Sequence, residues 1–518
     1  MSTLQGLIDA VSKDEHIAHV LERARATGAS ATTSLEISAP TAISPLLIAA
    51  LAKDSDRVQL VVTATAREAE DLTAALESLL PDGLIAEFPA WETLPHERLS
   101  PSSDTVGRRL AVLRRLAHPD DGAAGPVRVV VAPIRAVLQP IVKGLGDLRP
   151  VSASIGDEIA MESLVQSLAA AAYTRTDLVD KRGQFAVRGG IVDVFPPTEE
   201  HPVRLEFWGD TVEEIRYFKV ADQRSLEIAQ DGLWAPPCRE LLLTDEVRAR
   251  ARALAAVHPE LVEILDKLAD GTAVEGMEAL SPVLADGMEL LVDLIPADSR
   301  VLVCDPERVR TRAHDLVATS TEFLEASWHN AAAGNVTPID LGAAAYQSVA
   351  DVRTAAVDRG LGWWTISPFG AEIAEDGDTF QPADVDVVHL DVRVVDNYRG
   401  ETERALADIR GWLSSTWSVV VVTVGHGTAD RLAETFRGEG LGVRVVDAVD
   451  AGPEPAMVTI VTGNLDRGFI LPGAQMSVIT ETDLVGQRST TRDARRLPTR
   501  RRQTIDPLTL KTGDYVVH

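Results

Sequence analysis

Residues 173–210 read YTRTDLVDKRGQFAVRGGIVDVFPPTEEHPVRLEFWGD. Apolar and charged side chains alternate along much of this stretch, a pattern typical of antiparallel strands with one buried and one exposed face. Four arginines fall within or beside the expected strands: Arg175, Arg182, Arg188 and Arg204. We therefore predict a small sheet whose outer face carries arginines, a residue type whose planar guanidinium suits docking surfaces.

The charge of the whole chain makes these arginines unusual. The 518 residues contain 50 Lys and Arg against 78 Asp and Glu, for a formal net charge of −28. Because affinity for nucleic acid comes largely from cationic side chains, this balance disfavours nonspecific nucleic-acid binding by the whole chain but leaves a local basic site open. The length predicts three or four domains, at about 100–200 residues each.

Cysteine usage and hydropathy indicate the compartment. Cys238 and Cys304 lie far apart and lack metal-ligand spacing, so we expect neither a metal site nor a disulfide. The N-terminal residues are typical of an amphipathic helix rather than a signal peptide, and the longest valine-rich run has only the length of a strand. These features predict a cytoplasmic protein that does not associate with membranes.

Strand-like and helix-like runs alternate on both sides of the quoted stretch, which predicts an α/β multidomain protein. The expected parts are a P-loop-type parallel α/β domain (1–150 and 236–370), an inserted small β-rich (α+β) domain (151–235), a linker (371–383), a separate small α/β domain (384–485) and an Arg-rich linker (486–508). The first strand of the small α/β domain is expected at Val385–Leu390.

The P-loop-type domain lacks the residues that nucleotide chemistry requires. A phosphate-binding loop needs glycines, a lysine and a Ser or Thr after the first strand, whereas residues 38–45 read SAPTAISP. At the later strand, a proline follows Asp305 where hydrolytic chemistry requires an acidic residue. A degenerate nucleotide site is therefore expected at Ala39, Pro40, Ser44, Pro45, Asp305 and Pro306. This predicts no catalytic residue and no cofactor in the chain.

Three motifs resemble those of bacterial transcription-repair coupling factors. They read FPAWETLP at 88–95, RGQFAVRGGIVDVFP at 182–196 and ETDLVG at 481–486, and the second is shared with the excision-repair protein UvrB. The resemblance runs from about residue 30 to the last residue. It implies a UvrB-like module whose inserted domain binds UvrA.

Carried over by motif position, the UvrA-contacting residues are Arg175, Arg188, Arg204 and Glu206, with Phe185 as an apolar neighbour. Arg204 and Glu206 are two residues apart, which places them on the same face of a strand. Ala186 stands where UvrB has an arginine, so one contact is expected to be missing or replaced.

The same resemblance implies the function of the larger protein. Residues 511–518 read KTGDYVVH and resemble the first strand of the family's RNA polymerase-interacting domain, whose start we place at 509–518. The family implies a transcription-coupled nucleotide excision repair factor that recruits UvrA to RNA polymerase stalled at DNA lesions. ATP, Mg²⁺ and most DNA contacts are expected in motor domains outside this sequence, whose translocation displaces the polymerase.

Other readings of the residues stay open. One is a damage-sensing DNA-binding module, which the acidic balance opposes, and another is a divergent ATP-dependent helicase-like enzyme, which the prolines of the first loop oppose. Arg–Glu pairs also occur on solvated sheet faces that bind nothing. Phe185 fits a core position as well as an interface, and the Arg-rich linker fits either a nucleic-acid contact or a solvated tether.

Overall fold

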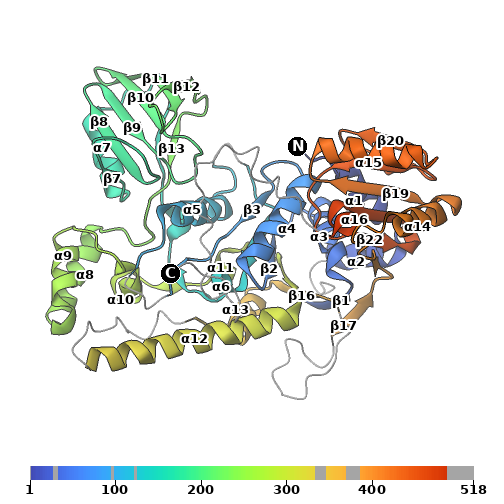
Figure 1. The fold of residues 1–518 in the computed structure, drawn as a ribbon. Coiled ribbons are helices and arrows are strands. Elements are labelled where there is room, and N and C mark those ends of the chain that lie inside the picture. Colours follow the sequence, from blue (N-terminus) through green and yellow to red (C-terminus); the bar gives the residue numbers. More distant parts are fainter. Residues whose placement is uncertain are drawn as a thin grey trace.

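The structure is a computed structural model that describes residues 2–26, 33–94, 99–121, 125–332, 346–368 and 385–486. Figure 1 shows a large sheet in the middle, the sheet of the inserted domain at one end and a third sheet at the other. The predicted linkers at 371–383 and 486–508, apart from Gly486, lie outside the described residues, as does the segment 509–518.

A seven-stranded sheet forms the centre of the chain, and all its strand pairs are parallel. In spatial order its strands are β17 (Asp386–His389), β1 (Ser34–Ser38), β16 (Gly362–Ser367), β15 (Arg300–Cys304), β2 (Gln59–Thr63), β4 (Val129–Pro133) and β3 (Ile85–Glu87). Successive strand residues enter opposite hydrophobic clusters, Val61 one and Leu60 the other. The predicted parallel α/β architecture is confirmed.

Helices cover both faces of this sheet, as a parallel sheet buried on two sides requires. One face packs against α1 (Gln5–Val11), α2 (Glu15–Arg25), α3 (Ser44–Asp54) and α4 (Ala66–Leu79). The other packs against α5 (Ser103–Ala117), α6 (Ile134–Leu138), α11 (Leu291–Leu294), α12 (Pro306–Ala332) and α13 (Val349–Asp358).

The chain enters the inserted domain through β6 (Val151–Ala153) and leaves it through β13 (Leu233–Ala235), and these two strands pair with each other. Between them lie α7 (Met161–Ala170) and a six-stranded sheet. In spatial order that sheet contains β12 (Ser225–Ile228), β11 (Thr211–Phe218), β10 (Val203–Trp208), β9 (Ile191–Val194), β8 (Gln184–Arg188) and β7 (Thr174–Arg175).

A compact helical piece follows the inserted domain before the parallel sheet resumes. Its helices are α8 (Asp245–Ala255), α9 (Val262–Ala269) and α10 (Ser281–Leu284), and they share a hydrophobic cluster of their own. The short strands β5 (Ile141–Val142) and β14 (Met288–Glu289) pair beside it.

The third sheet contains six strands. In spatial order they are β18 (Arg393–Val394), β22 (Phe469–Leu471), β23 (Met476–Thr480), β19 (Ser418–Thr423), β21 (Val458–Thr462) and β20 (Val443–Val446). One face packs against α14 (Thr402–Ser414), α15 (His426–Gly438) and α16 (Glu481–Val485). The opposite face packs into the same hydrophobic cluster as α1 to α4.

Two features differ from the expected small α/β domain at the C-terminal side. The strand expected at Val385–Leu390 forms as β17 but pairs with β1, so it extends the central sheet instead of opening the third one. The third sheet is also not separate. Backbone bonds join Gly6 to Val449 (2.6 Å) and Val449 to Thr3 (2.7 Å), so α1 lies between the two sheets. A short strand pattern cannot reveal which of two sheets it joins.

Candidate partner-binding surface

The sheet of the inserted domain has two unlike faces. Its inner face packs against α7 through apolar side chains that include Phe185, Val192 and Leu205. Phe185 is only 1% exposed. Of the two alternatives left open for Phe185, a core position or an interface position, the structure shows the core position, because the ring packs behind the surface.

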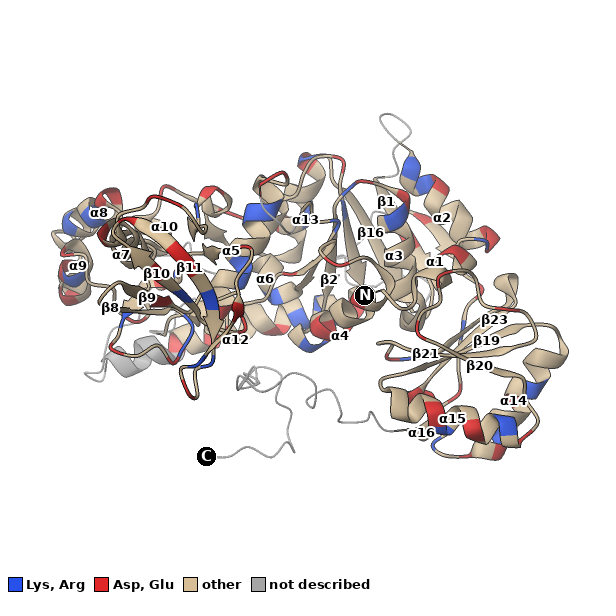
Figure 2. Cartoon of the chain, turned by 90° about the horizontal axis from the view of Figure 1, so that it is seen from above, with Lys and Arg blue, Asp and Glu red and all other residues tan. Residues whose placement is uncertain are grey.

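Strand register places the outer-face residues in rows. One row crosses β8 to β11 through Ala186, Asp193, Arg204 and Arg216. The next row contains Arg188, Ile191, Glu206 and Glu214. Acidic and basic residues are thus interleaved on these strands, as Figure 2 shows for the inserted domain. Arg204 and Glu206 share this face, as their spacing predicts.

Asp193 is the centre of this face. It is 1% exposed, and its carboxylate accepts hydrogen bonds from two arginines. Arg204 donates two, from Nε at 2.7 Å and from Nη2 at 2.9 Å, and Arg188 donates one from Nη2 at 2.5 Å. A buried carboxylate requires such partners, and in return it fixes the direction in which both guanidinium groups point.

The two arginines differ in how far they reach solvent. The Arg188 side chain is 46% exposed and the Arg204 side chain is 14% exposed. Arg204 also lies over the Phe218 ring, 4.6 Å from its centre. The hydrogen bonding of Arg204 to the Asp193 carboxylate, which accepts from it, is the main cause that raises the pKa of Arg204 above its usual value. Arg188 is therefore the more accessible cation, and Arg204 is the more rigidly held one.

Three further residues of this face were not singled out from the sequence, although the alternation of β10 and β11 places them there. Arg216 donates to Glu214 (2.6 Å), and Glu214 stands directly opposite Glu206. Trp208 ends β10 with 75% of its surface exposed. Asp193 was also missed, because the motif drew attention to its arginines.

Two of the positions named from the sequence present no accessible group on the outer face. Arg175 is exposed, but β7 pairs with β8 so that Arg175 stands beside Phe185, on the inner side of the sheet. The structure therefore places Arg175 on the other side of the sheet from Arg188 and Arg204, and its contact with UvrA stays a prediction. Ala186 lies on the outer side but is 1% exposed, in a small cluster with Val179, Phe195 and Phe218 that covers this corner.

The two loops of the expected degenerate nucleotide site follow β1 and β15 in the central sheet, with β16 between those strands. The Ala39 N–H donates to the Ser367 carbonyl (2.8 Å), and the Asp305 N–H donates to the Ile366 carbonyl (2.8 Å). Ser44 is buried, and its hydroxyl has no hydrogen-bond partner among the described residues. The prolines at 40, 45 and 306 have no N–H to offer.

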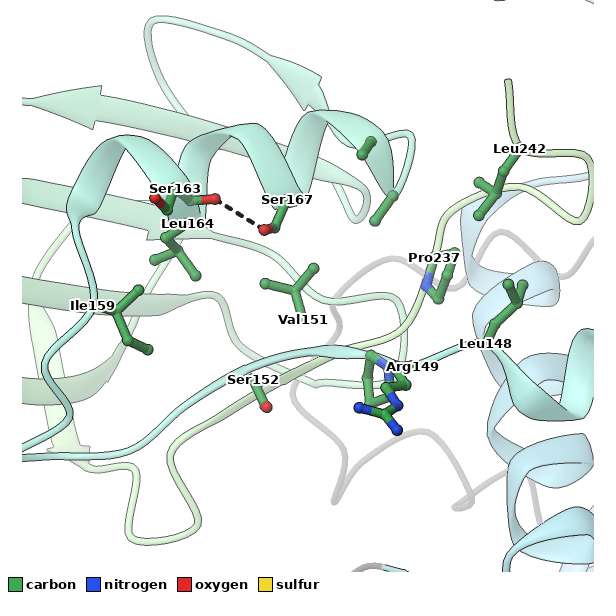
Figure 3. A pocket seen from close by; sticks show the side chains of 13 residues that line it. Leu148, Arg149, Val151, Ser152, Ile159, Ser163, Leu164, Ser167, Pro237 and Leu242 are labelled. Carbon is green, nitrogen blue, oxygen red and sulfur yellow. Dashed lines mark hydrogen bonds between the residues drawn. The ribbon is translucent and has the colours of Figure 1, made fainter. Parts of the chain in front are cut away.

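A cavity of about 500 Å³ lies where the inserted domain joins the central one (Figure 3). It is bounded by the incoming segment 148–152, by the outgoing segment near Pro237 and by α7. Arg149 is the one charged residue of its lining, and the Ser167 hydroxyl is bonded to the Ser163 carbonyl of its own helix (2.9 Å). Polar groups do not converge on the space, so it is a junction between domains rather than a site for chemistry.

Comparison with known proteins identifies the inserted domain. A family model described as the UvrB interaction domain matches residues 151–236, which are the inserted domain. The chain is 46% identical over 504 residues to the transcription-repair-coupling factor of Mycobacterium tuberculosis, covering 93% of this chain and 40% of that protein. The chain corresponds to the N-terminal portion of the transcription-repair-coupling factors. The resemblance carried by the three motifs is confirmed.

Other transcription-repair-coupling factors match at lower identity. The Bacillus subtilis protein is 24% identical over 488 residues, covering 90% of this chain and 40% of the relative. The chain spans about 40% of the length of these relatives. In the part of the chain that the structure describes, no helix is long and apolar enough to cross a membrane, and no group of three or more His, Cys, Asp or Glu is placed to hold a metal ion.

Proposed function

We propose that this chain recruits UvrA to RNA polymerase stalled at DNA lesions, as the N-terminal part of a cytoplasmic transcription-coupled nucleotide excision repair factor. One observation carries the proposal. Asp193 holds Arg188 and Arg204 on the outer face of a domain that matches the UvrB interaction domain. The family resemblance names UvrA as the partner, and the geometry supplies a surface that fits a protein partner.

The arrangement suits docking because the cations are oriented before the partner arrives. Binding normally costs side-chain entropy at each arginine that becomes fixed, and the bonds to Asp193 reduce that cost. The Arg188 side chain is 46% exposed, so it can bind a partner carboxylate in addition to Asp193. Glu206, exposed in the same row, adds an acceptor of opposite charge that sets the orientation of the partner.

We also propose that the central domain is a structural scaffold that does not bind nucleotide. Proline at 40, 45 and 306, and backbone N–H groups already bonded at Ala39 and Asp305, support this. ATP and Mg²⁺ then act in motor domains elsewhere in the protein, which translocate on DNA and displace the polymerase. Isothermal titration of the 518-residue chain with Mg-ATP tests the point, and micromolar binding would contradict it.

The docking proposal is tested by titrating UvrA into the chain and its Arg188→Ala variant. We expect at least about a tenfold loss of affinity, because the accessible cation is removed while the core is untouched. The Arg67→Ala variant is the matched control, since Arg67 is an 81% exposed arginine on the central domain. Equal UvrA affinity of wild type and Arg188→Ala would contradict the assignment of the binding surface. Tight duplex DNA binding without UvrA binding would favour a damage-sensing module instead.

A further inference from the structure

Trp208 is the most exposed aromatic side chain among the exposed large hydrophobics of the described residues. It is 75% exposed, whereas Phe323, the other aromatic in that set, is 36% exposed. Tryptophan buries more apolar area than any other side chain when it packs, so leaving it in water forgoes a large stabilisation. An exposed tryptophan on a protein surface is therefore a candidate contact residue.

The position of Trp208 connects it to the face described above. Arg204, Glu206 and Trp208 alternate with the buried residues of β10, so all three point outward. The neighbouring turn between β8 and β9 contains Gly189 and Gly190, and the Gly190 carbonyl accepts the Phe207 N–H (2.8 Å). Because glycines have no side chain that could cover the indole, this turn leaves Trp208 exposed to solvent.

Two acidic residues face each other across the sheet close to Trp208. Glu206 stands directly opposite Glu214, and like charges in directly opposed positions destabilise a sheet. Arg216 pairs with Glu214, so the charge of the second acid is compensated within the sheet. Glu206 remains exposed, one step from Trp208 along the outer face.

We infer that Trp208 is the apolar anchor of the UvrA interface, inserted in an apolar pocket of UvrA that is bordered by a basic group facing Glu206 and by an acidic group facing Arg188. This inference rests on the proposed function. It assigns to Trp208 the apolar role that the sequence motif suggested for Phe185, which lies in the core. A central aromatic residue flanked by an arginine and rim charges is the usual composition of an interface hot spot.

The experiment is a titration of UvrA into the 518-residue chain carrying Trp208→Ala, Trp208→Phe or Val257→Ala. We expect Trp208→Ala to weaken binding by about tenfold or more, and Trp208→Phe to restore most of the affinity because an aromatic ring still fills the pocket. Val257 is a 71% exposed residue outside the inserted domain, so Val257→Ala should bind like wild type. The exposure of Trp208 predicts that all three variants keep the circular dichroism and melting temperature of the wild type.

The result separates the inference from the function on which it rests. If Arg188→Ala loses affinity while Trp208→Ala binds like wild type, the anchor is overturned and the docking surface stands. If the wild type itself does not bind UvrA, both are overturned. A loss of affinity in Trp208→Ala that Trp208→Phe does not recover would also overturn the anchor, because it would point to a requirement other than an apolar ring.

Discussion

Two buried carboxylates of this chain use their arginines in opposite ways. Asp193 lies under the outer face of the inserted sheet, and its partner Arg188 is 46% exposed. Glu240 lies in the segment that leaves the inserted domain, and its partner Arg109 is fully enclosed, with 2.5 Å between Nε and Oε1. Trp91 also donates to Glu240, at 3.0 Å, so the closed pair ties the exit of the inserted domain to the central domain.

The difference shows that burial of the acid does not decide the role of the pair. At Asp193 the acid is buried but Arg188 extends toward solvent, which presents a cation to a partner. At Glu240 the arginine is buried as well, stacked 4.3 Å from the Phe88 ring centre and bonded to the Pro89 carbonyl (2.9 Å). The Arg109–Glu240 pair, the closed pair, therefore holds the inserted domain against the central domain. The Arg188–Asp193 pair, the open pair, presents a cation to a partner.

The largest expected effect is at the closed pair. Glu240→Ala leaves the Arg109 charge buried without its acid, and breaking one side of a buried pair costs about 3–5 kcal/mol. We expect lowered protection in hydrogen exchange around α5 and β13. Arg109→Met with Glu240→Leu should recover most of the protection, because both charges are removed. A single variant as stable as wild type would break the comparison.

A smaller effect is expected at the open pair. Asp193→Ala removes the hydrogen bonds to two arginines that can partly turn to water, a loss of about 1.5–3 kcal/mol. Hydrogen exchange of β8 to β10 measures it, and UvrA affinity should fall because the arginines are no longer oriented. Asp177→Ala, an exposed acid of the same domain, serves as the control. Equal losses at Asp193 and Glu240 would mean that solvent access of the arginine does not matter.

Phe185 tests whether the surface or the core behind it carries the contact. Phe185→Leu should cost roughly 1–2 kcal/mol, less than the ~3–5 kcal/mol typical of Phe→Ala, because much of the core volume stays filled. UvrA affinity should match that of wild type at a temperature where the variant is folded. A tenfold loss of affinity with only this small loss of stability would return Phe185 to the interface.

The smallest effect is expected at the unpaired hydroxyl of Ser44. Ser44→Ala removes a buried polar atom that has no partner among the described residues, so stability should change by less than about 1 kcal/mol or rise. The control is Thr65→Ala, which removes the N-cap of α4 and should cost ~1 kcal/mol. Thermal melts of both variants provide the measurement, and a marked loss at Ser44 would indicate an undetected role for the first loop.

Much of this arrangement follows from local sequence. The alternation of strand-like and helix-like runs predicted the α/β architecture, and β17 (Asp386–His389) forms within the range expected for a strand, Val385–Leu390. The spacing of Arg204 and Glu206 predicted their common face. Local patterns failed where the answer depends on distant contacts, as for β17, which could have joined either sheet.

The candidate site was predicted in part for the same reason. Motif matching selected the arginines by their positions in the shared block, but it gave no direction for the Arg175 side chain, which depends on how β7 pairs with β8. Alternation along β8 places Phe185 on the face opposite Arg188. Only the structure shows that α7 covers this face and buries Phe185. Trp208 was available from alternation alone, two residues beyond Glu206.

The position of α1 between two sheets also has a consequence for biosynthesis. Leu4 and Leu7 pack in one cluster with Phe469 and Val478, residues made more than 450 positions later. At ~5–20 residues per second, the first helices wait roughly 25–90 s on the ribosome for their final neighbours. During that interval their apolar faces need protection, so the earliest part of the chain to emerge is expected to be a principal client of chaperones and among the last parts to become native.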